Sequence, residues 1–311
     1  MGVGEGYGKT ILIGDQFVVQ GIPAIVSSIS YKTIAVVEKI EGKGWSLDDR
    51  RTEVPGYKKS KEKQQVESIN RILDVMKIDT EKQGLKITFN GDLLAGSGVG
   101  ASAASCVSLA RALNDEFGLG LPIERINEIA WEGEFAYHGI PSGVDNTASC
   151  YGGLMFFQLK NREKTFERIE VKKPIDIVLG NSGVSANTAL LDSLVEKQRE
   201  NDPDLFESRM KKITRQVEEV RKALLEFDLE KVGSIMTENH GILIDMGLSH
   251  PKLIQLCNLA LENGALGAKL TGGGMGGFMI ALVPDREIQE RVSALMEAGG
   301  FYTIKATIGG S

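Results

Sequence analysis

The sequence GSGVGASAAS, residues 96–105, is the stretch that decides the fold. Three alternating glycines are followed by small residues and by an apolar helical pattern that stops at Gly118. Glycine lets a bound anion approach the backbone, and the free N–H groups of a helix N-terminus attract phosphate. The stretch therefore predicts a phosphate-binding loop at the start of a helix. A plain tight turn with a helix cap is the alternative.

The segments on either side of this loop predict a strand before it and two helices after it. LKITFNGDL (85–93) has the strand pattern, and residues 122–137 give the second helix. A dinucleotide-binding unit would need a strand after the first helix, with an acidic residue about 20 positions on. The G-x-G-x-x-A match at 98–103 therefore does not indicate a dinucleotide site.

The N-terminal region predicts short strands followed by a loop and a helix. The strand predictions, β-branched runs broken by glycine or proline, are KTILIG (9–14), QFVVQG (16–21), PAIVSSI (23–29) and TIAVVEKI (33–40). Residues 42–63 are polar and predict an exposed loop, and 64–77 carry apolar residues at helical spacing.

The remaining sequence predicts two strands, a long helical region and a mixed end. GGLMFFQL (152–159) and IDIVLGN (175–181) predict strands, and residues 186–263 are almost wholly helical. The end predicts strands at 267–270, 278–283 and 302–308 and a helix at 285–298. We expect an α+β fold, with a strand-rich N-terminal lobe (1–183) and a helix-rich C-terminal lobe (184–311) that closes with strands.

Composition narrows the function classes. The chain has 311 residues, 42% hydrophobic and 25% charged, which excludes a disordered chain and a coiled-coil rod. Its net charge of −6 disfavours a nucleic-acid partner. No apolar run approaches the roughly 18 residues of a membrane helix, and no signal peptide pattern is present. Three cysteines without metal-ligand spacing predict free thiols, and we expect a cytoplasmic protein.

Two further glycine-rich stretches contain candidate functional groups. GEGYGKT (4–10) is not a P-loop, because Val3 stands where the first glycine is required and a strand follows instead of a helix. Lys9 is a candidate active cation, and an ordinary solvated lysine is the alternative. TGGGMGG (271–277) predicts a backbone that passes close to a ligand or to another loop.

Two carboxylates flank the turn HGIPSG (138–143), namely Glu134 and Asp145. A magnesium–nucleotide site uses one or two carboxylates together with phosphate oxygens. Phosphoryl transfer to an alcohol uses an aspartate that accepts the hydroxyl proton. Surface charges are the alternative interpretation for both residues.

These blocks, in this order, resemble the motifs of the GHMP kinases, most closely the mevalonate kinase branch. The resemblance covers about residues 6–308. It rests on GYGKTILIGDQFVVQGIPAIV (6–26), the phosphate loop, EGEFAYHGIPSGVDNTASCYGG (132–153), GNSGVSANT (180–188) and GAKLTGGGMGG (267–277).

The resemblance implies a two-lobed GHMP kinase fold and phosphorylation of mevalonate with ATP and Mg²⁺. It makes Asp145 the catalytic base, with Lys9 beside it to lower the pKa of the substrate hydroxyl. It assigns Mg²⁺ to Ser102 and Glu134. The residues implied to bind the triphosphate are Gly96, Ser97, Gly98, Val99, Gly100, Ala101, Ser102 and Ala103, and those implied to bind the acceptor are Asp15, Gln16 and Ser142.

The sequence departs from the family pattern at a few positions. Tyr7 replaces a proline, Ala101 replaces a serine, Met275 interrupts the last glycine run, and Asp15-Gln16 replaces Glu-His. The last change leaves two alternatives open. One is a GHMP kinase for another acceptor, phosphomevalonate or a sugar, and the other is a silent ligand-binding member. A silent member predicts loss of catalytic groups, and all four candidates are present. No nucleic acid or membrane partner is expected, and a homodimer is left open.

Overall fold

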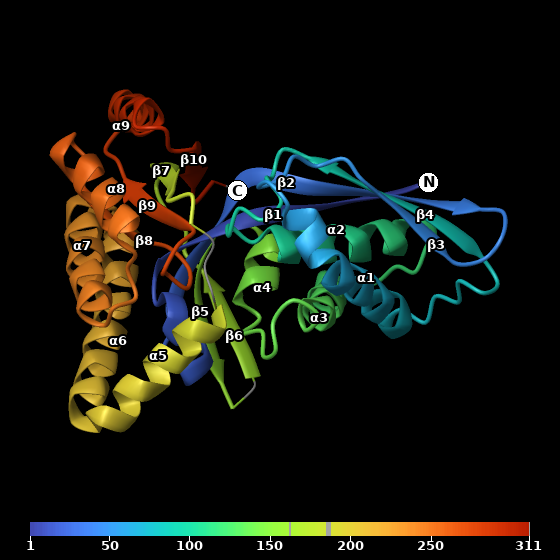
Figure 1. The fold of residues 1–311 in the computed structure, drawn as a ribbon, viewed down its shortest axis with the longest axis horizontal. Coiled ribbons are helices and arrows are strands. Elements are labelled where there is room, and N and C mark those ends of the chain that lie inside the picture. The colour runs from blue at the N-terminus through green and yellow to red at the C-terminus, as the bar shows by residue number, and fades with distance from the viewer. Residues whose placement is uncertain (162, 185–187, 311) are drawn as a thin grey trace. The chain divides into compact units, whose positions relative to one another are not determined.

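The computed structural model describes residues 1–161, 163–184 and 188–310, and these form two compact units. The first unit comprises Met1–Lys9 and Ser28–Gly152. The second comprises Thr10–Ser27 and the chain from Gly153 onward. Strands β1 (Gly2–Ile13) and β2 (Ala24–Ile40) pair with each other and run through both units. Figure 1 shows the order of the elements along the chain.

The first unit is a sheet covered by helices. Strand β4 (Gly84–Gly91) pairs antiparallel with β2 and parallel with β3 (Trp45–Asp49). In this register Ala35 lies opposite Phe89, and Leu47 opposite Ile87. The helices are α1 (Tyr57–Val75), α2 (Ala101–Glu116), α3 (Ile123–Glu134) and α4 (Val144–Tyr151).

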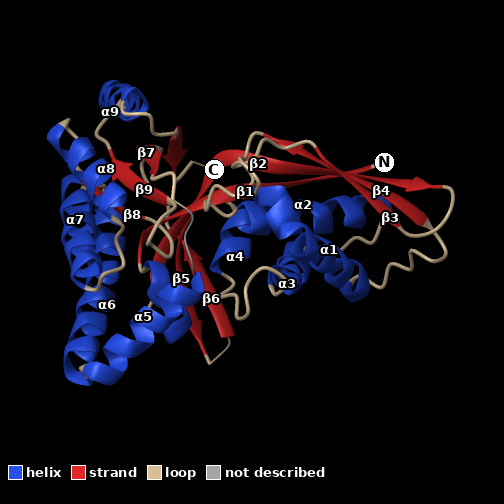
Figure 2. Cartoon of the chain, viewed as in Figure 1, coloured by secondary structure: helices blue, strands red, loops and turns tan. Residues whose placement is uncertain are grey.

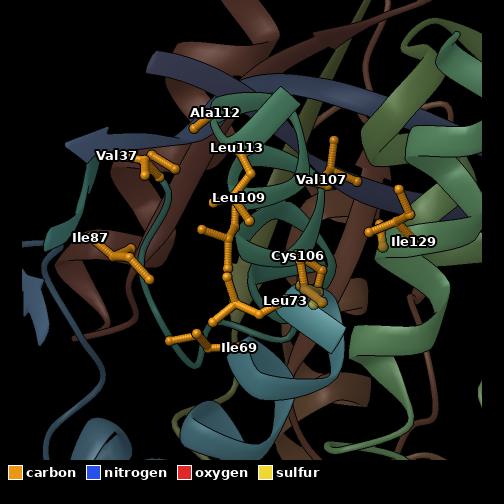
Figure 3. Packing of buried hydrophobic residues seen from close by; sticks show 14 of the residues in the cluster. Val37, Ile69, Leu73, Ile87, Cys106, Val107, Leu109, Ala112, Leu113 and Ile129 are labelled. Carbon is orange, nitrogen blue, oxygen red and sulfur yellow. The ribbon is translucent and has the colours of Figure 1, made fainter. Parts of the chain in front are cut away.

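The core of the first unit lies between these strands and helices (Figure 3). Val37 and Ile87 from the sheet, Ile69 from α1 and Leu109 from α2 are all at most 2% exposed. Helix α2 is the central element, since 11 of its residues are buried. Its small and apolar side chains explain why it can be enclosed on several sides.

Strand β1 lies against α2 without side chains between them. A β-carbon added at Gly2, Gly4 or Gly6 would lie 2.2 Å from the carbonyl oxygen of Ala112, Ser108 or Ala104, respectively. Two strand residues advance about 6.6 Å and four helix residues about 6 Å, so the two repeats match along this contact. The N-terminal glycines therefore serve close backbone packing.

The second unit contains a four-stranded antiparallel sheet and most of the remaining helices (Figure 2). The sheet order is β10–β7–β9–β8. Strand β5 pairs with the first residues of β2 and with β6, all antiparallel. The elements are η1 (Asp15–Gln20), β5 (Leu154–Lys160), β6 (Glu163–Arg168), β7 (Ile175–Asn181), α5 (Thr188–Asn201), α6 (Pro203–Glu226), α7 (Leu229–Asp245), α8 (Pro251–Glu262), β8 (Gly267–Leu270), β9 (Phe278–Leu282), α9 (Arg286–Ala298) and β10 (Thr303–Ile308).

The α+β class and most predicted elements are confirmed. Three predictions are wrong. The separate strands predicted at 23–29 and 33–40 are one continuous strand, β2. Residues 16–20 do not form a strand but belong to the 3₁₀ helix η1, which is flanked by Gly14 and Gly21, both in the left-handed conformation with φ of 100° and 86°. The segment 42–63 is not one exposed loop, because it contains β3 and the first turns of α1. Strand β3 depends on pairing with β4, which its own polar sequence does not reveal.

The compact units also divide at a different place from the predicted lobes, 1–183 and 184–311. Residues 175–181 form β7, the strand between β9 and β10, so this segment belongs with the C-terminal sheet. The described part of the chain contains no helix that combines the length and apolar character needed to cross a membrane. All three cysteines are free, as predicted.

The packing of β1 on α2 generates a stability prediction. Gly4→Ala should destabilise the protein by about 1–3 kcal/mol or more, because the new methyl group meets a helix carbonyl that cannot move aside alone. The measurement is the midpoint of urea unfolding, followed by far-UV circular dichroism. Gly241→Ala is the control: Gly241 lies exposed in α7 with no atom within 4 Å of the added carbon, so it should be neutral or stabilising. Equal midpoints for the two variants would contradict the packing argument.

Candidate active site

The predicted phosphate loop forms the entry to helix α2. Gly96, Gly98 and Gly100 all have φ near 80°, a left-handed conformation that favours glycine, and Gly100 directly precedes the helix. A β-carbon at Gly100 would lie 2.7 Å from Cγ of Lys9. The loop therefore leaves the first N–H groups of α2 at its end, with Lys9 packed against it.

Lys9 is held inside the first unit and is not a solvated side chain. Its backbone N–H donates to the carbonyl of Val99 at 2.8 Å, which ties the strand to the loop. Its ammonium lies 3.1 Å from Oδ1 of Asp145, and the two side chains are 6% and 27% exposed. A cation that is removed from water in this way requires a partner, and Asp145 supplies it.

Helix α4 explains the position of Asp145. The helix begins at Val144, after Gly143 in the left-handed conformation, and Asp145 lies in its first turn. A carboxylate is favoured there by the helix dipole. Ser142, predicted to bind the acceptor, accepts a hydrogen bond from the N–H of Val144 at 3.3 Å. The sequence predicted the turn at 138–143 but not the helix that begins directly after it.

Glu134 ends helix α3 as a buried carboxylate, 1% exposed. Burial, and then the charge of Asp145, raise the pKa of Glu134 to about 8, while a hydrogen bond from Ser102 acts in the opposite direction. The thiol of Cys106 also donates to Oε1 of Glu134 at 3.7 Å. The structure thus brings together Lys9, Asp145, Glu134, Ser102 and the loop in the first unit.

A charged cluster beside Ser102 was not predicted from the sequence. Arg51 is 6% exposed and donates to both oxygens of Asp49 and, at 2.5 Å, to Oγ of Ser105 on α2. Lys58 donates to the carbonyl oxygen of Asp49 at 2.8 Å. A small pocket here is lined by Asp49, Arg51, Tyr57, Lys58, Lys61, Gln65, Ala101, Ser102, Ser105 and Tyr137. The only signal in the sequence was the charge density of a segment that we predicted to be a loop.

The other predicted acceptor residues, Asp15 and Gln16, lie in the second unit at the start of η1. Asp15 is buried, and its carboxylate is bound by the ammonium of Lys269 and by the N–H of Gly272. The glycine run 271–277 passes close to another loop, as predicted: a β-carbon at Gly274 would lie 2.2 Å from the carbonyl oxygen of Leu248. In GNSGVSANT (180–188), residues 185–187 lie outside the described part.

Comparisons with known proteins agree with this geometry. The model of the GHMP kinases N terminal domain matches residues 67–153, and that of the GHMP kinases C terminal domain matches 220–299. The mevalonate kinase of Pyrococcus furiosus is 32% identical over 94% of this chain and 92% of its own length.

Solved structures give the same result. The L. major mevalonate kinase in complex with R-mevalonate matches with a TM-score of 0.94 and 34% identity, covering 100% of this chain and 97% of its own. The phosphomevalonate kinase of Streptococcus pneumoniae matches at a TM-score of 0.75 and 15% identity, over 97% of this chain and 98% of its own, and shares the fold alone. The chain belongs to the GHMP kinase family, in the branch of the mevalonate kinases.

Proposed function

We propose that this protein transfers the γ-phosphate of ATP to the 5-hydroxyl group of mevalonate. The observation that carries the proposal is the ion pair of Lys9 with Asp145, 3.1 Å apart, beside the glycine loop at the N-terminus of α2. The likeness to relatives named mevalonate kinase supports the choice of acceptor, including one solved with R-mevalonate.

The loop and α2 are suited to hold the phosphates of ATP. Glycines in the left-handed conformation leave the backbone open to an anion, and the first turn of a 16-residue helix adds N–H groups and the positive end of its dipole. Ser97 is 1% exposed, and its hydroxyl is one of the buried polar atoms that have no hydrogen-bond partner among the described residues. A buried donor of this kind favours a bound acceptor such as a phosphate oxygen.

Asp145 is the proposed base for the acceptor hydroxyl. It is the more exposed partner of the ion pair, so an alcohol can reach its carboxylate. Lys9 is buried and fixed by the loop, and its charge stabilises the alkoxide that forms as the proton leaves. Proton transfer to a positioned carboxylate is the recurring device in transfer of phosphate to alcohols.

Ser102 and Glu134 fit a Mg²⁺ ion. Hydroxyl and carboxylate oxygens are the hard ligands that Mg²⁺ prefers, with phosphate oxygens and water completing the set. A buried Glu134 with a raised pKa would be ionised by an adjacent cation, which explains why a carboxylate is placed there. When bound, the ion neutralises charge on the phosphates. The pocket lined by Tyr57 and Lys58 is the proposed location for the rest of the nucleotide.

Replacing the base should stop the reaction while preserving the fold. Asp145→Asn should lower kcat by roughly 10²–10⁴-fold, because the amide cannot accept the proton, and ATP binding should remain. The measurement is ADP release in a coupled assay, with circular dichroism as the check on folding. The matched control, Asp245→Asn at the end of α7, should retain parental turnover. Turnover near the parent in folded Asp145→Asn would remove this residue from the role.

The metal ligands can be tested by titration with Mg²⁺. Ser102→Ala and Glu134→Gln should each raise the Mg²⁺ concentration for half-maximal rate, because each removes a hard oxygen ligand. Glu128→Gln is the control, since Glu128 lies on the same helix, pairs with Arg125 and is exposed. Titration curves of both variants that overlay the parental curve would show that the metal binds elsewhere.

A panel of acceptors tests the proposed substrate. The parent should release ADP with mevalonate and much less with phosphomevalonate, homoserine or galactose. Gln16→His should change KM for mevalonate by no more than about tenfold and kcat only a few-fold, because a neutral hydrogen bond contributes about 0.5–1.5 kcal/mol and one to a charged group about 1.5–3.

The opposite result identifies the alternative function. A parent that is inert with mevalonate, and a Gln16→His variant that gains activity, would mean that Asp15-Gln16 marks a change of acceptor. A parent inert with every acceptor, although it binds ATP, would support a silent ligand-binding protein.

A further inference from the structure

A buried ion pair joins two distant segments of the second unit. Lys269 on β8 is 0% exposed, and its ammonium donates to Oδ2 of Asp15 and, at 2.7 Å, to the carbonyl of Leu270. The other carboxylate oxygen, Oδ1 of Asp15, accepts from the N–H of Gly272 at 3.0 Å. One carboxylate oxygen of Asp15 therefore binds Lys269 on β8, and the other binds Gly272 near the start of the glycine run Thr271–Gly277, which we call the third glycine loop.

Neighbouring bonds connect the same two segments. Oγ1 of Thr271 accepts from the N–H of Ile11 at 2.9 Å and donates to the carbonyl of Ile11 at 3.0 Å. The hydroxyl oxygen of Thr10 lies 3.1 Å from Oγ1 of Thr271. The third glycine loop thus begins in a fixed position on the segment that leads into η1.

Gln16 lies next to the third glycine loop. A β-carbon added at Gly273 would lie 3.2 Å from Oε1 of Gln16. The far end of the loop is also held, since the N–H of Met275 donates to Leu248 O at 2.7 Å and that of Gly277 to Val184 O at 2.8 Å. The shape of the loop beside Gln16 therefore depends on contacts at both of its ends. Among these contacts, the ion pair between Asp15 and Lys269 is the one between charged groups.

The burial of Asp15 and its pairing with Lys269 argue against direct contact with the acceptor. Mevalonate is a carboxylate, and an uncompensated aspartate beside it would repel it. Pairing with Lys269 cancels that charge, and burial removes Asp15 from solvent. Asp15 also has a φ of 21°, an uncommon backbone conformation that persists where surrounding contacts fix it.

We propose that Asp15 and Lys269 form a positioning pair that fixes the third glycine loop against η1 and so sets the affinity for the acceptor through Gln16. Asp15 acts through the loop and does not itself contact the acceptor. The inference rests on the proposed function for its kinetic part, whereas the fixing of the loop does not depend on the identity of the substrate.

A double-mutant cycle tests the pair. Asp15→Asn and Lys269→Met should each raise KM for mevalonate by about tenfold, with a smaller change in kcat. The KM of the double variant should not exceed the higher of the two single-variant KM values. KM for ATP should stay within about twofold of the parental value. Glu290→Gln, which breaks an exposed pair with Lys305, is the control and should leave every constant unchanged.

Hydrogen–deuterium exchange in the absence of substrate measures directly how firmly the third glycine loop is held. Peptides covering η1 and the third glycine loop should exchange faster in each variant, and peptides from α2 should not. If the single variants fail to fold, the double variant still decides the question, because it buries no uncompensated charge. It should show a raised KM and faster loop exchange.

Two results would overturn the positioning role. One is a raised KM in Asp15→Asn with a parental KM in folded Lys269→Met, which would mean that Asp15 contacts the acceptor directly. The other is parental exchange in the loop of the double variant. A parent inert with mevalonate would overturn the proposed substrate instead, and the exchange experiment would still test the loop.

Discussion

The backbone contact between strand β1 and helix α2 is the constraint on which the candidate active site depends. Alternate glycines let the strand lie directly on the helix, at a spacing where two strand residues match four helix residues. This contact fixes where the strand reaches the loop, and Lys9 follows immediately, bonded through its backbone to Val99. The glycine composition of the N-terminus is thus a requirement of packing, and its consequence is the placement of a buried cation beside a phosphate loop.

Charge is distributed unevenly within the first unit, around Lys9, Asp145 and Glu134. Lys9 is buried against one carboxylate, Asp145, while a second carboxylate, Glu134, is also buried nearby with a pKa raised to about 8. One cation does not compensate two carboxylates. Burial and the charge of Asp145 therefore favour the neutral form of Glu134, and only a bound cation such as the proposed Mg²⁺ would ionise it. Asp145 is the partly exposed partner of the ion pair.

The ion pairs Lys9–Asp145 and Lys269–Asp15 show how burial separates structural from chemical use of the same groups. In the second unit Lys269 and Asp15 are almost fully enclosed, and backbone groups take up their remaining hydrogen-bonding capacity. Such a pair specifies geometry, since removing one partner leaves a buried charge. In the first unit the aspartate remains accessible. Residue type alone would have assigned both aspartates to the substrate.

Local patterns in the sequence were sufficient for the loop at 96–105, its helix, and the strands and helices whose periodicity is strong, and motif order was sufficient for the family. Motif order also named Lys9, Ser102, Glu134 and Asp145, which lie together in the first unit and whose roles stay predictions. Local patterns failed where the deciding partner is distant in the chain. Strand β3 forms because β4 pairs with it, and η1 replaces a predicted strand because the left-handed glycines on both sides of it, Gly14 and Gly21, turn the chain. The burial of Lys9 and the pairing of Asp15 with Lys269 were likewise decided only by tertiary structure, since an ion pair between residues 254 positions apart leaves no periodic signal in the sequence.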